Sequence, residues 1–288
     1  MYHAIIRVSE EMKKINLIIG CGYLGRSLLK ILHDESNYVV NRSEQHNAIN
    51  SVEDNHQIIL NINDKQTWRN LDVLSKKTSI RIYFMVPPSQ IDRTAFPGFI
   101  ERLNKLDVQK AVLVSSTVVY GNKDRVVDAD SDVHIDSERA ERQSFIEQDW
   151  LAAVKKGSII RFAGIYGPER VIGKNGILKG DTINGDPDGW LNLIHVDDGA
   201  ELLKRIGAMD DSEPIELACD GHPIKRGEYY SFLAKQLNQL EPIFSHHSND
   251  RGMGRRCDNS VTISRSGWQP KHVDFRKAVS NLIKQNEN

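Results

Sequence analysis

A glycine-rich turn between an apolar run and a helical pattern constrains this chain most. Residues 15–19 predict a buried strand, and Gly20, Gly22 and Gly25 follow at G-x-G-x-x-G spacing. In such a turn Gly20 permits the tight bend, Gly22 lets a pyrophosphate approach the backbone, and Gly25 lets the helix pack on the strand. The helix N-terminus offers free N–H groups to phosphates. The turn therefore predicts a dinucleotide site, with a purely structural strand–turn–helix unit as the alternative.

Strand-like runs alternate with helical patterns over residues 15–162. This alternation predicts an α/β fold with a Rossmann-type doubly wound parallel sheet, covered by helices on both faces. The later elements are short and irregular, which predicts a small C-terminal lobe over the carboxyl edge of the sheet. We expect an N-terminal extension (residues 1–14), a dinucleotide-binding Rossmann domain (15–165), and a small substrate lobe interleaved with the Rossmann core (166–288).

The elements follow from periodicity and from breaker residues. Pro97 predicts that the helix within residues 90–106 begins near Gly98, and Asp197 or Asp198 is expected to cap a later helix. The expected strands are 38–40, 57–62, 80–86, 111–114, 158–162, 190–195 and 214–218, and the other expected helices are 137–156, 199–206, 226–240 and 273–285.

Bulk composition narrows the class of partner. Hydrophobic residues make up 39% of the 288 residues, which supplies a sizeable core. A net charge of −1 does not indicate a nucleic-acid or anionic-membrane surface. The longest apolar runs have about the length of a strand, so no membrane span is expected. Three widely spaced cysteines favour a reduced, cytoplasmic setting, and neither they nor His246-His247 has metal-ligand spacing.

The end of the second strand bears on the choice of cofactor. In this fold a carboxylate there bonds the ribose 2′-hydroxyl of NAD. This chain has Asn41 and Arg42 instead, and no carboxylate before Glu44. Because an arginine can pair bidentately with a 2′-phosphate, we expect NADP to be preferred over NAD. The alternative is that Arg42 is an exposed loop residue.

Pro87-Pro88 end the fourth strand and form a stiff loop after it. This loop lies at the carboxyl edge of the sheet, where such sheets have their ligand crevice. The expected cofactor-binding residues are Gly20, Gly22, Tyr23, Leu24, Gly25, Asn41, Arg42, Val86, Pro87 and Ser115.

Five motifs in order carry a family resemblance. They are the glycine turn, residues 115–121 (SSTVVYG), residues 161–168 (RFAGIYGP), residues 194–198 (IHVDD) and a late segment with RCDNS and GWQP. From residue 15 to about 285 the chain resembles the extended short-chain dehydrogenase/reductase family of NAD(P)-dependent epimerases and dehydratases. The resemblance implies that Ser116 is catalytic and hydrogen-bonds a substrate hydroxyl or keto oxygen. Alternatively, these serines only satisfy backbone groups at a strand end.

The resemblance also implies a tyrosine, with a lysine four residues later, as the acid/base. Those positions fall near Arg139 and Gln143, and none of the tyrosines has a lysine four residues on. The chain is therefore similar to an atypical branch that lacks the dyad. Arg139 or Arg142 can stabilise an anion but cannot act as a base.

Other candidates have a structural interpretation beside a functional one. We expect His134 to lie in a solvated loop, Tyr120 and Tyr166 to pack rather than react, and Cys21 to be a small filler, although the helix N-terminus can lower a thiol pKa. The basic loop with Arg251, Arg255 and Arg256 can either grip a substrate phosphate or carboxylate or be merely exposed.

Two functions remain open. The first is an NADP-preferring oxidoreductase or epimerase acting on a small oxygenated or sugar-nucleotide substrate, with the proton supplied by water or the substrate. The second is a catalytically inactive NAD(P)-binding sensor, since such a protein needs no proton relay. The helix at 137–156 also suggests a possible homodimer by analogy with relatives.

Overall fold

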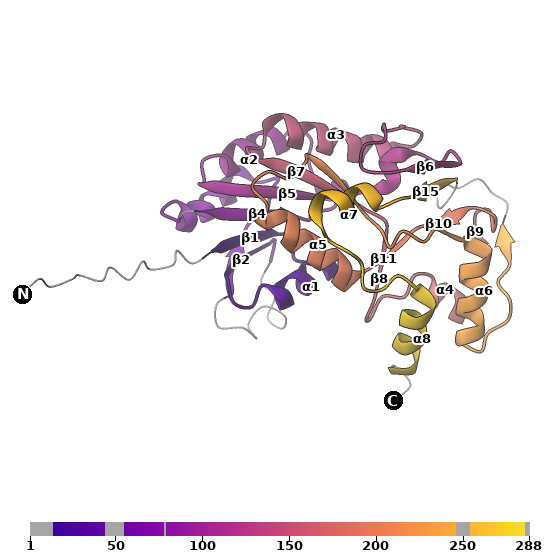
Figure 1. The fold of residues 1–288 in the computed structure, drawn as a ribbon. Helices are drawn as coiled ribbons and strands as arrows, with labels where there is room; N and C mark the ends of the chain where they lie inside the picture. The colour runs from indigo at the N-terminus through magenta and orange to yellow at the C-terminus, as the bar shows by residue number, and fades with distance from the viewer. Residues whose placement is uncertain (1–13, 44–54, 78, 246–253, 286–288) are drawn as a thin grey trace, which may run out of the picture.

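A seven-stranded parallel sheet forms the centre of the molecule (Figure 1). The computed structural model describes residues 14–43, 55–77, 79–245 and 254–285. The strand order is β12-β7-β5-β4-β1-β2-β3, and every neighbouring pair is parallel. The predicted fold class is confirmed. The strands are β1 (Ile15–Ile19), β2 (Ser36–Asn41), β3 (Asn55–Ile59), β4 (Ile80–Phe84), β5 (Val108–Ser116), β7 (Gly157–Phe162) and β12 (Ile215–Ala218).

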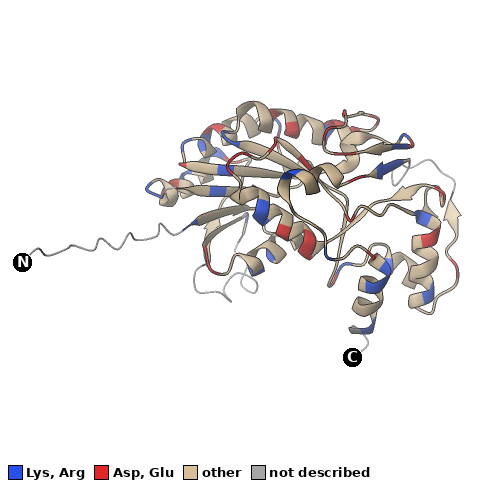
Figure 2. Ribbon diagram, in the orientation of Figure 1, with Lys and Arg blue, Asp and Glu red and all other residues tan. Residues whose placement is uncertain are grey.

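The sheet is buried on both faces because its strands are apolar at successive positions. In β1, Leu17 and Ile19 pack on one face, while Ile18 packs on the other. The first face is covered by η1 (Lys65–Leu74), α2 (Phe96–Leu103) and α3 (Glu138–Ala153), and the second by α1 (Tyr23–Ile31) and α5 (Val196–Ala208). Charged residues of both signs lie along these outer helices and the loops, and most of the strand ribbon is formed by uncharged residues (Figure 2).

The C-terminal half both completes the sheet and forms the lobe. β12 pairs with β7 at the sheet edge, and α5 packs against α1. A separate apolar cluster around Tyr229, Leu233 and Val279 holds the lobe together. The lobe elements are β8 (Gly164–Tyr166), α4 (Lys174–Lys179), β9 (Ile183–Asn184), β10 (Trp190–Leu191), β11 (Leu193–His195), β13 (Ile224–Lys225), α6 (Arg226–Gln236), β14 (Phe244–Ser245) and α8 (Phe275–Gln285).

The remaining elements lie at the boundary between sheet and lobe. They are η2 (Pro88–Gln90), η3 (Thr117–Tyr120), β6 (Arg125–Val127), β15 (Arg255–Cys257) and α7 (Ser260–Ser266). β6 and β15 pair in parallel although about 130 residues separate them.

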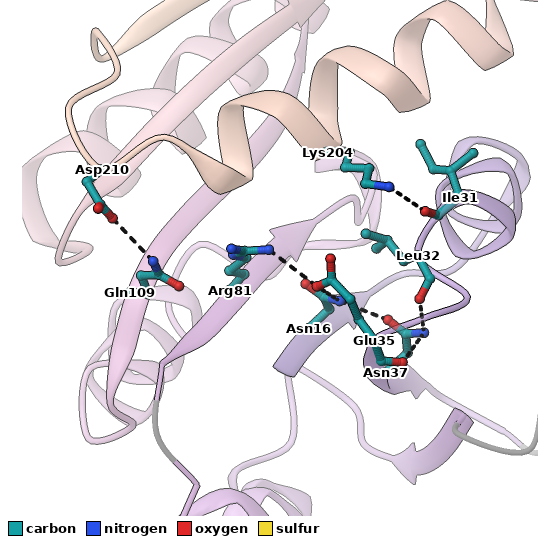
Figure 3. Close-up of polar contacts among 9 residues, drawn as sticks. All are labelled: Asn16, Ile31, Leu32, Glu35, Asn37, Arg81, Gln109, Lys204 and Asp210. Carbon is teal, nitrogen blue, oxygen red and sulfur yellow. Dashed lines mark hydrogen bonds and ion pairs between the residues drawn. The ribbon is translucent and has the colours of Figure 1, made fainter. Parts of the chain in front are cut away.

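A polar network fixes the amino end of the sheet (Figure 3). The Asn16 amide donates to Glu35 Oε2 and to Asn37 Oδ1, both at 3.0 Å, and Arg81 Nη1 donates to the same Glu35 oxygen at 3.3 Å. Because Asn16 and Arg81 are almost fully buried, these partners offset the cost of removing polar groups from water. The network leaves the opposite, carboxyl end of the sheet for ligands.

Three local predictions are corrected. The second helix begins at Phe96 rather than near Gly98, because a proline in the first helical turn needs no N–H partner. The cap of α5 is His195, whose ring accepts the Asp197 N–H at 3.3 Å. The helix expected at 137–156 spans Glu138–Ala153, and Lys156, beyond its end, has a left-handed φ of 54°.

Several predictions fall on residues outside those described: the N-terminal residues 1–13, Glu44, His246-His247 and Arg251. Within the described ranges, no helix combines the length and apolar character needed to cross a bilayer. Those ranges also contain no cluster of three or more side chains of the types that ligate metals.

Candidate functional site

A cavity of about 620 Å³ opens at the carboxyl ends of the central strands. It lies where the connections from β1 and β4 leave toward opposite faces of the sheet, the topological switch point at which such sheets bind ligands. All ten residues expected to contact a cofactor line it, from Gly20 in the turn to Ser115 at the end of β5. The fold thus gathers residues that are up to 95 positions apart in the chain.

The glycine turn forms one wall of the cavity. Gly20 has a φ of +88°, and its N–H donates to the Val40 carbonyl at 3.2 Å. Gly22 is the N-cap residue of α1, and no side chain among the described residues accepts a hydrogen bond from the first N–H groups of the helix. A Cβ placed on Gly22 would meet no atom within 4 Å. The first N–H groups of α1 therefore border open space, which is the arrangement that receives a phosphate.

A loop from the lobe meets this wall. The Tyr23 hydroxyl donates to the Pro168 carbonyl at 2.8 Å, and the Arg170 guanidinium lies 5.4 Å from the centre of the Tyr23 ring. Gly167 is required here, because a Cβ at its φ of +153° would lie 2.8 Å from the Tyr23 hydroxyl. Arg170 and Ile165 line the cavity, and no spacing in the sequence had singled out either residue.

The basic end of the cavity is at β2. Arg42 is exposed and lines the cavity next to Asn41, which is buried. The lining contains three arginines, Arg42, Arg139 and Arg170, and no aspartate or glutamate among the described residues. The electrostatics of the cavity therefore favour an anionic ligand.

The two adjacent serines at the end of β5 have different surroundings. Ser115 lines the cavity, and its hydroxyl donates to Glu147 of α3. Ser116 is absent from the described lining, and its Oγ accepts the Val118 N–H at 3.3 Å as the cap of η3. The backbone-satisfying interpretation thus describes the observed contact of Ser116, and its catalytic role stays a prediction.

Glu147 anchors a buried pair beneath the cavity. Arg161 Nη2 lies 2.8 Å from Glu147 Oε2, and Arg161 Nε lies 3.1 Å from Oε1. Burial lowers the Arg161 pKa, but hydrogen bonds and charge from Glu147 and Tyr120 outweigh burial, so the net pKa is raised. β5 and β7 pair with Ser115 opposite Arg161, which aligns all three side chains. This pair is held in place and fixes how Ser115 presents its oxygen to the cavity.

The positions of the implied dyad also face the cavity. Arg139 and Gln143 both line it from α3, one helical turn apart. No tyrosine or lysine among the described residues lines the cavity from α3. Gln143 is only 5% exposed, and its Nε2 has no hydrogen-bond partner among the described residues.

Among the described residues, the cavity lining contains no group suited to acid–base work near neutral pH. Burial raises the pKa of Cys21 to about 11 and that of Tyr23 to about 12, against smaller opposing effects of nearby arginines. Cys21 is thus a neutral filler. The other titratable groups of the described lining are the three arginines, which stay protonated.

The remaining tyrosine and histidine candidates lie in packed surroundings. The Tyr120 hydroxyl donates to the Asp128 carbonyl at 2.6 Å, and burial raises its pKa to about 12. Tyr166 is fully buried, with its ring 5.3 Å from that of His195. The His134 N–H donates to Val119 from a half-buried loop.

The two basic-loop arginines that are described make internal contacts. Arg255 Nη1 donates to the Gly121 carbonyl at 2.6 Å and to Asn122 Oδ1 at 3.2 Å. Arg256 pairs with Asp124 at 3.2 Å.

Asp197 and Asp198 do not form an acid pair. Asp197 accepts from Ser27, and Asp198 accepts the N–H groups of Lys271 and His272.

No protein-family model matches the chain, and no curated protein sequence matches it. Solved structures do match, with probability 1.00. MoeE5 in complex with UDP-glucose and NAD is 19% identical, with a TM-score of 0.74 over 94% of this chain and 98% of that one. The dTDP-glucose 4,6-dehydratase of Bacillus anthracis in complex with NAD is 14% identical, with a TM-score of 0.77 over 95% and 96%.

A third match is the UDP-glucose 4-epimerase of Thermotoga maritima with UDP-glucose, which is 16% identical, with a TM-score of 0.74 over 95% of this chain and 100% of that one. The chain therefore shares its fold, over about 95% of its length, with a UDP-glucose 4-epimerase and a dTDP-glucose 4,6-dehydratase. At these identities the likeness is one of fold.

Proposed function

We propose that this protein binds an NAD(P) dinucleotide, NADP in preference, and acts as an oxidoreductase or epimerase on a small oxygenated or sugar-nucleotide substrate. The observation that carries the proposal is the glycine turn at the switch point, where uncapped N–H groups of α1 border a cavity of about 620 Å³. That volume is within the range of small-molecule and cofactor sites. Neighbours of the same fold hold NAD and UDP-glucose, which supports this ligand class.

The preference for NADP rests on Arg42. Its side chain lies at the end of β2, where the adenosine ribose of a bound dinucleotide is expected. A charge-assisted bond from a guanidinium to a phosphate is worth about 1.5–3 kcal/mol, or roughly 10- to 100-fold in affinity. The absence of carboxylates from the described lining supports the same choice.

The test is a titration of the protein with NADPH and, separately, with NADH. The fluorescence of the reduced nicotinamide monitors binding. We expect NADPH to bind about 10-fold or more tightly than NADH, and Arg42→Ala to remove most of that difference. Arg69→Ala is the control, since Arg69 is an exposed arginine outside the cavity. Equal affinity for both would discard the role of Arg42, and no binding of either would overturn the proposal.

In this proposal the chemistry proceeds without a tyrosine–lysine pair as proton donor, since the described lining contains no such pair. Hydride transfer to or from a bound nicotinamide is what the cofactor would supply. Ser115 presents an oxygen whose proton is already donated to Glu147, so it can accept a hydrogen bond from a substrate hydroxyl. The proton that accompanies hydride transfer is then supplied or taken up by water or by the substrate.

A second candidate, a catalytically inactive NAD(P) sensor, is favoured by one observation. The raised pKa values of Cys21 and Tyr23 leave the described lining without a group that titrates near pH 7. Single-turnover oxidation of bound NADPH with a panel of carbonyl compounds separates the two functions. Reduction of one compound in the panel would rule out the sensor function. NADPH binding without hydride exchange across the whole panel would favour the sensor function.

A further inference from the structure

Among the described residues, the wall of the cavity formed by α3 and the end of β5 has hydrogen-bond donors and no charged acceptor. Arg139 and Gln143 lie one turn apart on α3, and both line the cavity. Ser115, at the end of β5, donates its only hydroxyl proton to Glu147. The donors that remain for a ligand on this wall are a guanidinium and a primary amide.

The Gln143 amide is buried without a partner. The residue is 95% buried, and Nε2 is inaccessible to solvent and bonds no described atom. A buried donor without an acceptor is costly, so native proteins rarely retain one without a reason. Because Nε2 is closed to solvent, a ligand oxygen satisfies it only once the Gln143 side chain turns toward the cavity that it lines.

Arg139, an exposed residue of the same helix, also has no partner among the described residues. It makes no hydrogen bond or ion pair with a described residue, whereas Arg142, on the same helix, pairs with Glu138 at 2.6 Å. Arg255 lies close enough that the positive charge of Arg139 helps to lower its pKa, although burial lowers it most. The Arg255 charge is balanced by that of Asp136 and by its bonds to Gly121 and Asn122, whereas Arg139 has no such partner among the described residues.

The carboxylates near this wall are already engaged. Glu147 binds Arg161 and Ser115, and Glu138 binds Arg142. Asp136 raises the Arg255 pKa by its charge and accepts the Asn122 N–H at 2.6 Å. None of the three lines the cavity. The charge on Arg139 is therefore left for a ligand.

We propose that the substrate carries a carboxylate, which the Arg139 guanidinium binds with a further hydrogen bond from the Gln143 amide. The planar fork of arginine matches a carboxylate bidentately, and a primary amide adds a donor beside it. This inference rests on the proposed function and gives it a substrate class: an acid whose reacting carbon lies next to the nicotinamide, such as a uronic acid or an oxo acid.

The test measures anion binding without turnover. Protein saturated with NADPH, which fills the phosphate-binding turn, is titrated with malonate or with the neutral isostere malonamide at constant ionic strength, and Tm is recorded. We expect malonate at about ten times its Kd to raise Tm by roughly 2–4 °C. Malonamide should leave Tm unchanged.

Two variants and one control locate the effect. Arg139→Gln should weaken malonate binding about 10-fold or more, and Gln143→Leu about 3-fold. Arg142→Gln, on the same helix but outside this cavity, should bind malonate like the unmodified protein. Because all three sites are on one helix, general loss of folding would change their NADPH affinities together.

The outcomes separate this inference from the proposed function. A malonate shift that persists in Arg139→Gln, or an equal shift with malonamide, overturns the carboxylate site. If NADPH itself fails to bind, the proposed function is wrong, and the same malonate titration without NADPH still decides the role of Arg139.

Discussion

Within the glycine turn, single residues have separable roles. Gly20 has a left-handed φ, and a Cβ there would lie 3.0 Å from the Met85 backbone, so any side chain strains the protein itself. Gly22 has an ordinary φ of −84°, and a Cβ there would enter open space within the cavity. The structure therefore does not require glycine at position 22, but a closely bound pyrophosphate would.

This difference makes a prediction. Gly22→Ala should change Tm by less than about 2 °C, while weakening NADPH binding about 10-fold or more because the methyl group occupies the phosphate position. Gly20→Ala should lower the free energy of unfolding by more than about 1 kcal/mol. Thermal denaturation and the NADPH titration measure both effects. Unchanged NADPH affinity in Gly22→Ala would place the pyrophosphate elsewhere.

At the scale of elements, α3 is the part of the fold that presents Arg139 and Gln143. Its first turn is fixed by Ser137, whose side chain accepts the Ala140 N–H at 3.2 Å. Glu138 and Glu141 in the same turn complement the helix dipole. The cap sets where the helix starts, and with it the positions of the two cavity-lining side chains.

Ser137→Ala should therefore lower the free energy of unfolding by about 1 kcal/mol, because the N-terminal N–H groups lose an acceptor. Ser137→Asp, which keeps an acceptor, is the matched control and should retain most of the stability. Urea denaturation gives both values. Equal stability of the serine and alanine proteins would mean that water replaces the cap at no cost.

For the whole molecule, a buried acid lies where the sheet edge meets the lobe. Asp220 follows β12, and its N–H donates to Leu193 of β11 at 2.8 Å. Its pKa is raised to about 7, mainly by burial and also by the charges of Asp198 and Asp274, against a hydrogen bond from the His222 N–H. Folding therefore favours the protonated form.

The sign of the pH dependence follows from these two states. Between the unfolded pKa of about 4 and the folded value, the folded protein binds more protons, so stability falls as pH rises through that window. Asp220→Asn keeps the acceptor oxygen without the charge, so it should add on the order of 2–4 kcal/mol at pH 8 and much less at pH 4.

Urea denaturation at several pH values measures the effect of Asp220→Asn. Asp211→Asn, an exposed aspartate ahead of β12, should leave the pH dependence unchanged. A pH profile that is the same with and without the Asp220 carboxyl would show that this group does not control it.

Much of the architecture could be predicted from the sequence, because local patterns report on burial. Apolar runs without alternation marked strands covered on both faces, and the glycine spacing placed the turn after the first of them. The elements missed were short or weakly patterned. η1 is a run of tight turns, and β6 and β15 exist only because each pairs with the other.

Local patterns were thus enough to predict the fold class and the position of the glycine turn, since each is written in consecutive residues, and they show that no tyrosine has a lysine four residues on. Tertiary structure alone decided which of two adjacent serines lines the cavity, because successive strand residues point to opposite sides. It alone placed Arg170 over Tyr23 and left Arg139 and Gln143 Nε2 without a partner among the described residues. Which groups a side chain meets depends on the packing of distant segments, and local patterns do not encode that packing.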